Sequence, residues 1–423
     1  MTTTAAVEAE AADEGTADAA DTAGVGTAAR RTGFTVAADG SYAACLATDR
    51  AENWYPERWT LAGPEPYAVP LPCRQPEEPD STVLPLTDGR VLIRRRVDGR
   101  HRFSLLYPSG PATGEQPCGA LEAPGAGAEG EIELIAPAPG CAEVFALVPA
   151  GESTRLWLVH DSSGGGPGPA LAAELPGRCT GGHWLDRDGR LLAVDREVDG
   201  RTKTVAVDLG RGGEVSPLLQ ITAESNDHLV LADPDSGLLL VRSDAPGVGD
   251  RLGWGVLGST RPVRFSLTVP DTALTPFAVQ PGQVLTPERC GVALRLDGPA
   301  GSWLGVWRPG ERGLHHLAPP LGWITGTGLW TGSGELRLPC ATDDQLCGLA
   351  RITLPDPGPR SAVTLPAPPE RAAWTGPAPG EPAQAPDPDR RPARRRGLSL
   401  RKKAARPVPL GKAPMAREST AGG

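Results

Sequence analysis

Short apolar runs separated by Asp-Gly pairs recur along this chain. Residues 88–100, "DGRVLIRRRVDGR", and residues 188–201, "DGRLLAVDREVDGR", follow one pattern. In each, Asp-Gly-Arg opens an apolar run, and Val-Asp-Gly-Arg closes it before a second run begins. Asp-Gly between two apolar runs is typical of a tight turn, because Gly supplies the positive φ that such turns need. Both stretches therefore predict a β-hairpin.

A looser form of this hairpin occurs seven times in the sequence. The copies recur roughly every 50 residues, which is the spacing of blades in a β-propeller. They start at Asp39, Asp88, Gly140, Asp188, Ser236, Cys290 and Ser333. A further strand-like run precedes and follows each hairpin, which gives a repeating unit of four antiparallel strands. One such sheet cannot bury both faces alone, but copies arranged in a ring cover one another.

The repeat predicts an all-β fold, a seven-bladed β-propeller over residues 33–368. Six blades remain an alternative, in which the first hairpin packs elsewhere. We expect the ring to close by packing of blade on blade, without one blade that contains both ends of the propeller. Residues 1–32 form an acidic head rich in Ala and Thr, and residues 369–423 form a basic tail rich in Pro. Both compositions predict disorder.

The repeat resembles the TolB-like, WD40-like (PD40-type) β-propeller repeat. That unit runs from Asp-Gly through an apolar strand and an Asp-Gly turn to a strand ending in Val-Asp-Leu. The copy from Asp188, "DGRLLAVDREVDGRTKTVAVDLGRG", is the most similar to it. The resemblance covers about residues 33–368 and implies a propeller, with little about its role. The repeat also resembles the propeller that caps prolyl oligopeptidase-type serine peptidases, but the sequence has no GxSxG motif.

Composition narrows the class further. The 54 Gly and 46 Pro disfavour helical bundles and fit many short strands joined by turns. No basic start followed by an apolar stretch marks a secretory signal, so we expect a cytoplasmic location. The eight cysteines are then expected as reduced, buried side chains. Cys340 and Cys347 are predicted to lie opposite each other across a hairpin, where a disulfide or a shared metal is the alternative to two buried thiols.

Catalytic motifs are missing from the sequence. HExxH and P-loop motifs do not occur, and neither GxGxxG, at residues 125–130 and 253–258, has the strand and helix that a dinucleotide needs. No cofactor is therefore predicted. The carboxylates of "DRDGR" and "DPDSG" are interpreted as turn residues in preference to a cation site. His183 lies on a predicted innermost strand, and Asp186 and Asp188 lie where that strand turns into the next. These three residues are candidates for a site at the channel mouth.

The tail carries a strong local charge. Residues 390–417 hold eleven of the 42 Lys and Arg residues and no acid, so the rest of the chain sums to about −20. Such a segment can bind an anionic membrane surface or nucleic acid. The alternatives are that it binds the acidic face of its own propeller or nothing. The candidate contacts are Arg394, Arg395, Arg396, Arg401, Lys402 and Lys403.

The leading functional hypothesis is a non-catalytic scaffold that binds a protein or peptide on a propeller face, with the tail on an anionic partner. The alternative is an enzyme or small-ligand binder whose site lies at the channel mouth. Both agree with the fold, because a fold alone does not determine function.

Overall fold

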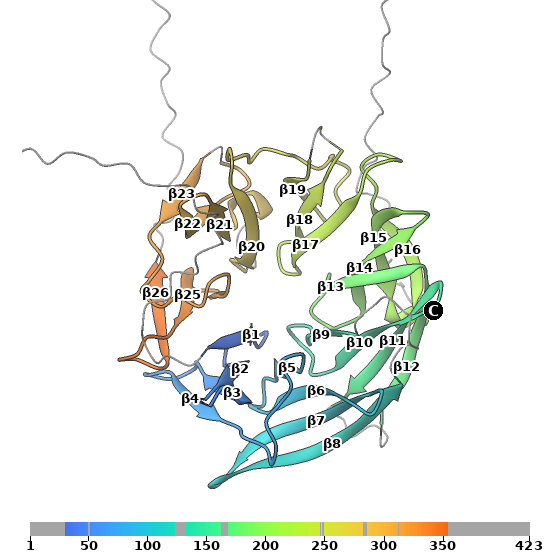
Figure 1. Ribbon diagram of the computed structural model, residues 1–423. Coiled ribbons are helices and arrows are strands. Elements are labelled where there is room, and N and C mark those ends of the chain that lie inside the picture. Colours follow the sequence, from blue (N-terminus) through green and yellow to red (C-terminus); the bar gives the residue numbers. More distant parts are fainter. Residues whose placement is uncertain are drawn as a thin grey trace, which may run out of the picture.

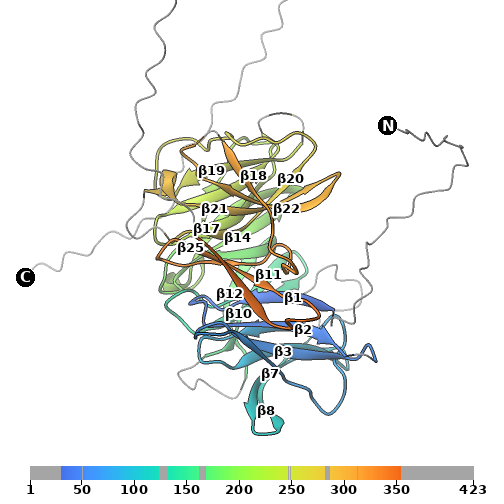
Figure 2. The same cartoon turned by 90° about the vertical axis from the view of Figure 1, so that its left-hand side faces the viewer.

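Seven small β-sheets stand around a central axis (Figure 1). The computed structural model describes residues 30–49, 51–122, 132–161, 168–245, 247, 249–281, 286–311 and 313–353. Turned by 90°, the same sheets are seen from the side (Figure 2). Within these ranges no helix is both long and apolar enough to cross a bilayer.

The strands and the two short 3₁₀ helices, in chain order, are β1 (Arg31–Val36), β2 (Tyr42–Thr48), β3 (Trp54–Thr60), β4 (Tyr67–Pro70), β5 (Thr82–Pro85), β6 (Val91–Val97), β7 (Arg100–Ser109), β8 (Ala112–Glu122), β9 (Glu133–Ile135), β10 (Val144–Ala150), β11 (Ser153–His160), β12 (Ala170–Pro176), β13 (Arg178–Trp184), β14 (Leu191–Val198), β15 (Arg201–Asp208), η1 (Leu209–Arg211), β16 (Glu214–Leu219), β17 (Asp227–Asp233), β18 (Leu238–Ser243), β19 (Arg251–Val256), β20 (Ala273–Val279), η2 (Pro287–Arg289), β21 (Val292–Gly298), β22 (Gly301–Trp307), β23 (Leu314–Leu317), β24 (Leu329–Trp330), β25 (Glu335–Cys340) and β26 (Gly348–Thr353).

Each sheet is one blade, in which strands pair antiparallel with their neighbours in sequence. Blades 1 to 4 and blade 6 have four strands each, whereas blade 5 (β17–β19) and blade 7 (β24–β26) have three among the described residues. In blade 5 an isolated bridge between Trp254 and Arg264 takes the place of a fourth strand. The run predicted as the last strand of blade 7, residues 361–366, lies outside the described residues. The predicted seven-bladed propeller is confirmed, and the first hairpin forms blade 1.

The repeated phrase forms a tight turn in both copies. Val97 pairs with Arg100 and Val198 pairs with Arg201, so that only Asp and Gly lie between the strands. Both residues of each turn have positive φ: 53° and 71° at residues 98 and 99, and 54° and 69° at residues 199 and 200. Two successive positive φ values define the type I′ turn, whose twist matches that of the strands beside it.

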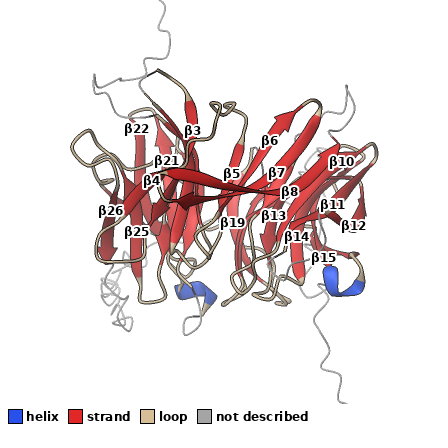
Figure 3. Ribbon diagram, turned by 90° about the horizontal axis from the view of Figure 1, so that it is seen from below, coloured by secondary structure: helices blue, strands red, loops and turns tan. Residues whose placement is uncertain are grey.

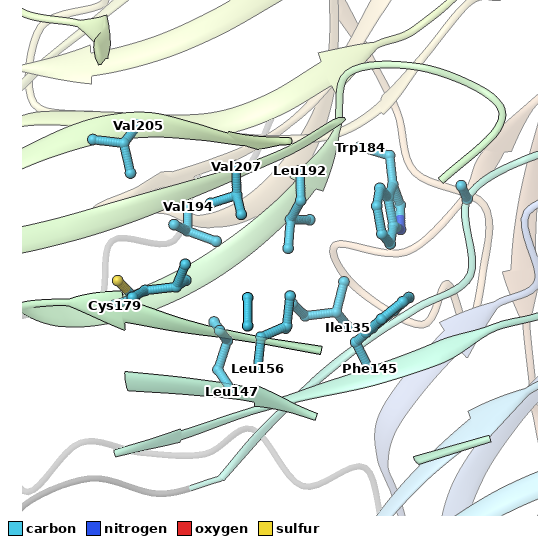
Figure 4. Close-up of a cluster of buried hydrophobic side chains, with 13 residues drawn as sticks. Ile135, Phe145, Leu147, Leu156, Cys179, Trp184, Leu192, Val194, Val205 and Val207 are labelled. Atoms are coloured by element: carbon cyan, nitrogen blue, oxygen red, sulfur yellow. The ribbon is translucent and has the colours of Figure 1, made fainter. Parts of the chain in front are cut away.

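Apolar clusters fill the space between neighbouring blades. Figure 4 shows the cluster between blades 3 and 4, where Phe145 and Leu147 of β10 meet Leu192 and Val194 of β14. Ala193, between those two residues of β14, points to the opposite side and joins the cluster between blades 4 and 5. Successive side chains of a strand face opposite sides of the sheet, so one apolar run serves two interfaces.

The ring closes by packing of blade 7 on blade 1, as the sequence predicted. The cluster at this closing interface has three fully buried members, Ala43, Trp59 and Leu61, and partly buried ones from both blades. The four strands of blade 1 are consecutive in sequence, so no described strand from the end of the chain joins it. β1 begins at Arg31, two residues before the predicted start of the propeller. The acidic head before residue 30 and the basic tail lie outside the described residues.

A buried ion pair supports the closing interface. Arg31 Nε lies 2.8 Å from Glu57 Oε1, and the exposed fractions of the two side chains are 8% and 6%. Trp59 donates its indole N–H to the same carboxylate oxygen at 2.7 Å. Arg31 also donates to the backbone carbonyl of Leu346 in blade 7 at 3.2 Å. The guanidinium therefore joins the two ends of the ring where the apolar cluster is small.

The hairpin of blade 7 corrects one prediction. The register pairs Cys340 with Gly348, so Cys340 and Cys347 do not lie directly opposite each other. The prediction centred the turn between Asp343 and Asp344. The loop instead contains one more residue after Asp344, so the strand resumes at Gly348. Both thiols are free in the structure, and Cys347 belongs to the closing interface.

The two 3₁₀ helices lie on the same side of the disc (Figure 3). η2 is in the loop that follows the innermost strand of blade 6, and η1 follows the third strand of blade 4. Because all blades repeat one strand order, loops of these two kinds open on this side throughout the ring. We call it the helix face.

Replacing Glu57 with Gln should destabilise the ring. Arg31 would stay buried without its counter-charge, and breaking a buried ion pair in this way costs about 3–5 kcal/mol. Chemical denaturation would measure the change in unfolding free energy. The control is Glu122→Gln, whose pair with Arg100 is exposed and should be worth about 0–1 kcal/mol. Equal effects of the two substitutions would contradict the role given to the buried pair.

Candidate functional site

A cavity of about 1060 Å³ lies at the centre of the ring. It is the central channel, because residues on or next to the innermost strand of each of the seven blades line it. These are, from blade 1 to blade 7, Thr35, Leu84, Ala136, His183, Leu231, Phe277 and Trp330. The channel wall thus depends on all seven blades and cannot form from any one of them.

Charged side chains line the channel in the loops of the helix face. Arg187 follows the innermost strand of blade 4, Asp233 and Asp235 lie at the end of that of blade 5, and Arg289 is in η2. Arg308 follows the third strand of blade 6. Arg187 Nη1 lies 2.7 and 2.9 Å from the two carboxylate oxygens of Asp235. The channel therefore has a charged mouth on the helix face and an otherwise largely apolar wall.

The structure separates the three residues predicted at the mouth. His183 lines the channel, whereas Asp186 and Asp188 lie in the loop after β13 and are not among the lining residues. Asp186 accepts backbone N–H groups of Arg190 and Leu191, both at 3.0 Å, so its carboxylate fixes the loop. The interpretation of "DRDGR" as turn residues is confirmed at Asp186.

The second motif with paired carboxylates, "DPDSG", also uses a carboxylate to fix its own loop. Asp233 accepts the backbone N–H of Ser236 at 3.0 Å and its hydroxyl at 2.5 Å. These bonds hold the loop between β17 and β18, which places Asp235 beside Arg187. Turn chemistry in one blade thus positions a charged group at the channel mouth.

Asp195 links blades 4 and 5 behind His183. Its Oδ1 accepts the hydroxyl of Thr204 at 2.6 Å and the backbone N–H of Leu229 at 3.1 Å. Its Oδ2 lies 3.1 Å from Nδ1 of His228. This hydrogen bond raises the pKa of His228 against the opposing effect of partial burial. For His183, burial lowers the pKa, and the charge of Asp195 opposes that shift.

A partly buried lysine with a fully buried carboxylate strengthens the same blade interface. Lys203 Nζ lies 2.8 Å from Oδ2 of Asp227, whose side chain is fully buried. Ser225 and Ser243 donate their hydroxyls to the other oxygen of Asp227, at 2.9 and 2.6 Å. With its acceptor positions filled by the fold, Asp227 is a structural group.

Sequence reasoning missed the arginines at the channel mouth, which are Arg187, Arg289 and Arg308, and the pair of Asp195 and His228 between blades 4 and 5. Arg187 lies between two residues that were chosen, and the signal that could have found it is its position in the loop after an innermost strand. Asp195 and His228 are far apart in sequence, so no local pattern joins them. Among the described residues, no cluster of three His, Cys, Asp or Glu side chains is placed to hold a metal. The six tail residues from Arg394 to Lys403 lie outside the described residues.

The two histidines should give opposite pH dependences. The pKa of His228 is raised above its ordinary value of 6.5, so its contact with Asp195 stabilises the fold below that pH and fades as pH rises through the folded-state pKa. The pKa of His183 is lowered, so stability is lost as pH falls below 6.5, where the unfolded chain binds a proton more readily.

We therefore expect His228→Gln to reduce the unfolding free energy more at about pH 5.5 than at about pH 8.5, and His183→Gln to lessen the loss of stability on acidification. Denaturation curves at the two pH values would measure both effects, each variant serving as the control for the other. If lowering the pH changed the unfolding free energy of both variants, relative to the parent chain, in the same direction, the assignment would be contradicted.

Comparison with known proteins finds similar solved structures but no family. No protein-family model matches this chain, and no curated protein matches it. Similar solved structures include a puromycin-hydrolysing peptidase of Mycobacterium tuberculosis, with 13% identity and a TM-score of 0.46 over 77% of this chain and 52% of that one. A putative TolB of Agrobacterium tumefaciens has 13% identity and a TM-score of 0.36 over 77% of this chain and 91% of that one. An oligogalacturonate lyase of Vibrio parahaemolyticus has 10% identity and a TM-score of 0.46 over 78% and 91%.

This chain spans about half the length of the mycobacterial peptidase. TolB proteins are thus among the structures with a similar propeller, as the repeat in the sequence led us to expect.

Proposed function

We propose that the propeller is a non-catalytic scaffold that binds a protein or peptide segment at the helix-face mouth of its channel. The observation that carries this proposal is the channel cavity of about 1060 Å³, lined by all seven blades. Pockets for small molecules commonly have volumes of about 300–1,000 Å³. A cavity slightly larger than that range, largely apolar inside and charged at the mouth, suits an extended peptide with apolar side chains and at least one charged group.

The polar groups around the channel support a binding role over a catalytic one. Arg187 is paired with Asp235, and Asp195 is saturated by donors from two blades. Catalysis would need a group that the fold leaves available to the substrate. The alternative of an enzyme at the mouth would rest on His183, whose lowered pKa keeps the imidazole neutral near pH 7.

Gly332 offers a way to test the channel. It lies in the turn between β24 and β25, lines the channel, and has no atom within 4 Å of the position of an added Cβ. Gly332→Trp should therefore place an indole in the mouth without a clash at its Cβ. The control is Gly313→Trp, beside the outermost strand of blade 6, where an added Cβ also meets no atom within 4 Å.

Peptides selected from a displayed random library against the full chain should lose affinity about tenfold or more in Gly332→Trp, because the indole occupies their site. Their affinity for Gly313→Trp should be unchanged. Fluorescence polarisation would measure both. Undiminished binding to Gly332→Trp would place the site elsewhere, and cleavage of the bound peptides, seen by mass spectrometry, would favour the enzyme.

We also propose a second contact through the basic tail, in a cytoplasmic setting. In such a reducing compartment the eight cysteines would remain thiols. Near an anionic membrane each basic residue contributes about 1 kcal/mol, and added salt weakens the contact.

The chain stopped at Gly376 should therefore lose most of its binding to vesicles that contain phosphatidylserine, while the full chain binds at low salt and releases as salt rises. Co-sedimentation would measure the bound fraction, with neutral phosphatidylcholine vesicles as the control. If both chains sediment equally with anionic vesicles, the tail does not carry the contact.

A further inference from the structure

A second, smaller cavity lies between blades 5 and 6 on the helix face, apart from the channel. Its volume is about 150 Å³, and none of its lining residues lines the channel. The end of β19 and the loop that follows form one wall, and η2 forms the other. A cavity of about 150 Å³ holds a molecule of the size of benzene.

The loop that forms this cavity is fixed at both ends. The backbone N–H of Trp254 donates to the carbonyl of Arg264 at 2.9 Å, and that of Arg264 donates back at 2.9 Å. Inside the loop, Ser259 donates its N–H to Val256 at 3.0 Å and accepts the N–H of Arg261 at 3.1 Å. The backbone that carries Arg261 and Arg264 is therefore held in place by its own hydrogen bonds.

Trp254 has a buried donor without an acceptor. Its side chain lines the cavity and is only 3% exposed, and no described residue accepts its indole N–H. A buried donor left unpaired lowers stability, so the environment of this indole is a sensitive position in the blade interface. The indole N–H of Trp330, which lines the channel, also has no acceptor among the described residues. Four other buried tryptophans do donate to an acceptor, namely Trp59, Trp184, Trp307 and Trp323.

The rim of the cavity is positively charged. Arg264 Cζ lies 5.0 Å from the centroid of the Trp254 ring, which is a cation–π contact. In the described part of the chain, neither Arg261 nor Arg264 forms an ion pair, and Glu288 is the acidic residue that lines the cavity. Two guanidinium groups thus oppose one carboxylate. A guanidinium that stacks on an indole keeps its N–H edge for a carboxylate, which it binds with two parallel hydrogen bonds.

We propose that this cavity binds a carboxylate attached to a compact apolar group of about the size of a benzene ring. The carboxylate pairs with Arg261 and Arg264, and the apolar group lies against Trp254, Val256, Pro262 and Pro287. A free aromatic acid and the C-terminal residue of a peptide both present this chemistry. The site is independent of the channel and of any binding there.

Benzoate is the probe for the first source, and the peptide Gly-Gly-Gly-Phe with a free C-terminus is the probe for the second. Benzamide and the amidated peptide are the uncharged controls. The indole N–H of Trp254 is observed by ¹H–¹⁵N correlation in the full chain and assigned by its absence in Trp254→Phe. We expect a saturable shift of that resonance with one or both carboxylates and none with the amides.

Substitutions give the quantitative test. The exposed Arg264→Gln should weaken binding about tenfold or more, the loss expected for a charge-assisted hydrogen bond. Trp254→Phe should weaken binding less, because a smaller aromatic ring still lies under Arg264. Glu288→Gln should tighten binding, because it removes the repelling charge. Trp303→Phe is the matched control in blade 6, since its indole is already bonded to His316 at 2.9 Å, and it should leave binding unchanged.

The outcomes are distinguishable. Tighter binding of benzoate assigns the site to a small acid, and tighter binding of the peptide assigns it to a chain terminus. An equal shift with the amides, a shift that never saturates, or full affinity in Arg264→Gln would overturn the proposal. Because Arg264 is exposed, its substitution tests the site even if Trp254→Phe, in the core, fails to fold.

Discussion

Burial of both faces of every blade is the constraint on which this structure depends. A blade of three or four short strands has two apolar faces, and it can bury both only against neighbouring blades. The second strand of a blade therefore carries an unbroken apolar run, as in "LLAV" of β14, where Leu192 and Val194 face blade 3 and Ala193 faces blade 5. Large residues on one face and a small one on the other let neighbouring blades approach closely on one side. The same arrangement occurs in β15, where Val205 and Val207 flank Ala206.

A ring built in this way must also close, and the interface that closes it buries the fewest apolar residues. The closing interface buries Ala43, Trp59 and Leu61 fully, against eight or more such residues in each of five other interfaces. The buried pair of Arg31 and Glu57 lies where the apolar contact is smallest. A buried pair contributes little net stability when its desolvation is counted, but its loss leaves a bare charge. The pair therefore acts mainly by fixing how the last blade sits on the first.

The fold was largely predictable because its signals are local. Asp-Gly turns and apolar runs lie within about 15 residues of each other, and the seven copies confirm one another. The exact register was not, since Cys340 pairs with Gly348 and the loop between them has no Asp-Gly to set its length. The candidate site was predicted in part: His183 lines the channel, but Asp195, whose charge affects the pKa of His183, could not be inferred. Contacts between blades join residues that are far apart in sequence, such as Asp195 and His228. No local pattern marks such pairs, so the sequence does not predict them.

The helix face gathers both candidate sites for a structural reason. Loops that follow the innermost and the third strands open there, and a loop can change its sequence at little cost to the apolar interfaces between blades. The channel mouth uses the first kind of loop, through Arg187 and Asp235. The smaller cavity uses the second kind, through Arg261 and Arg264, together with η2 from the first. Blade 5 contributes to both sites, and it is a blade with three described strands, in which a loop pinned at Trp254 and Arg264 replaces regular pairing. Because regular pairing ends at this bridge, the backbone between Val256 and Arg264 forms a loop that lines the cavity.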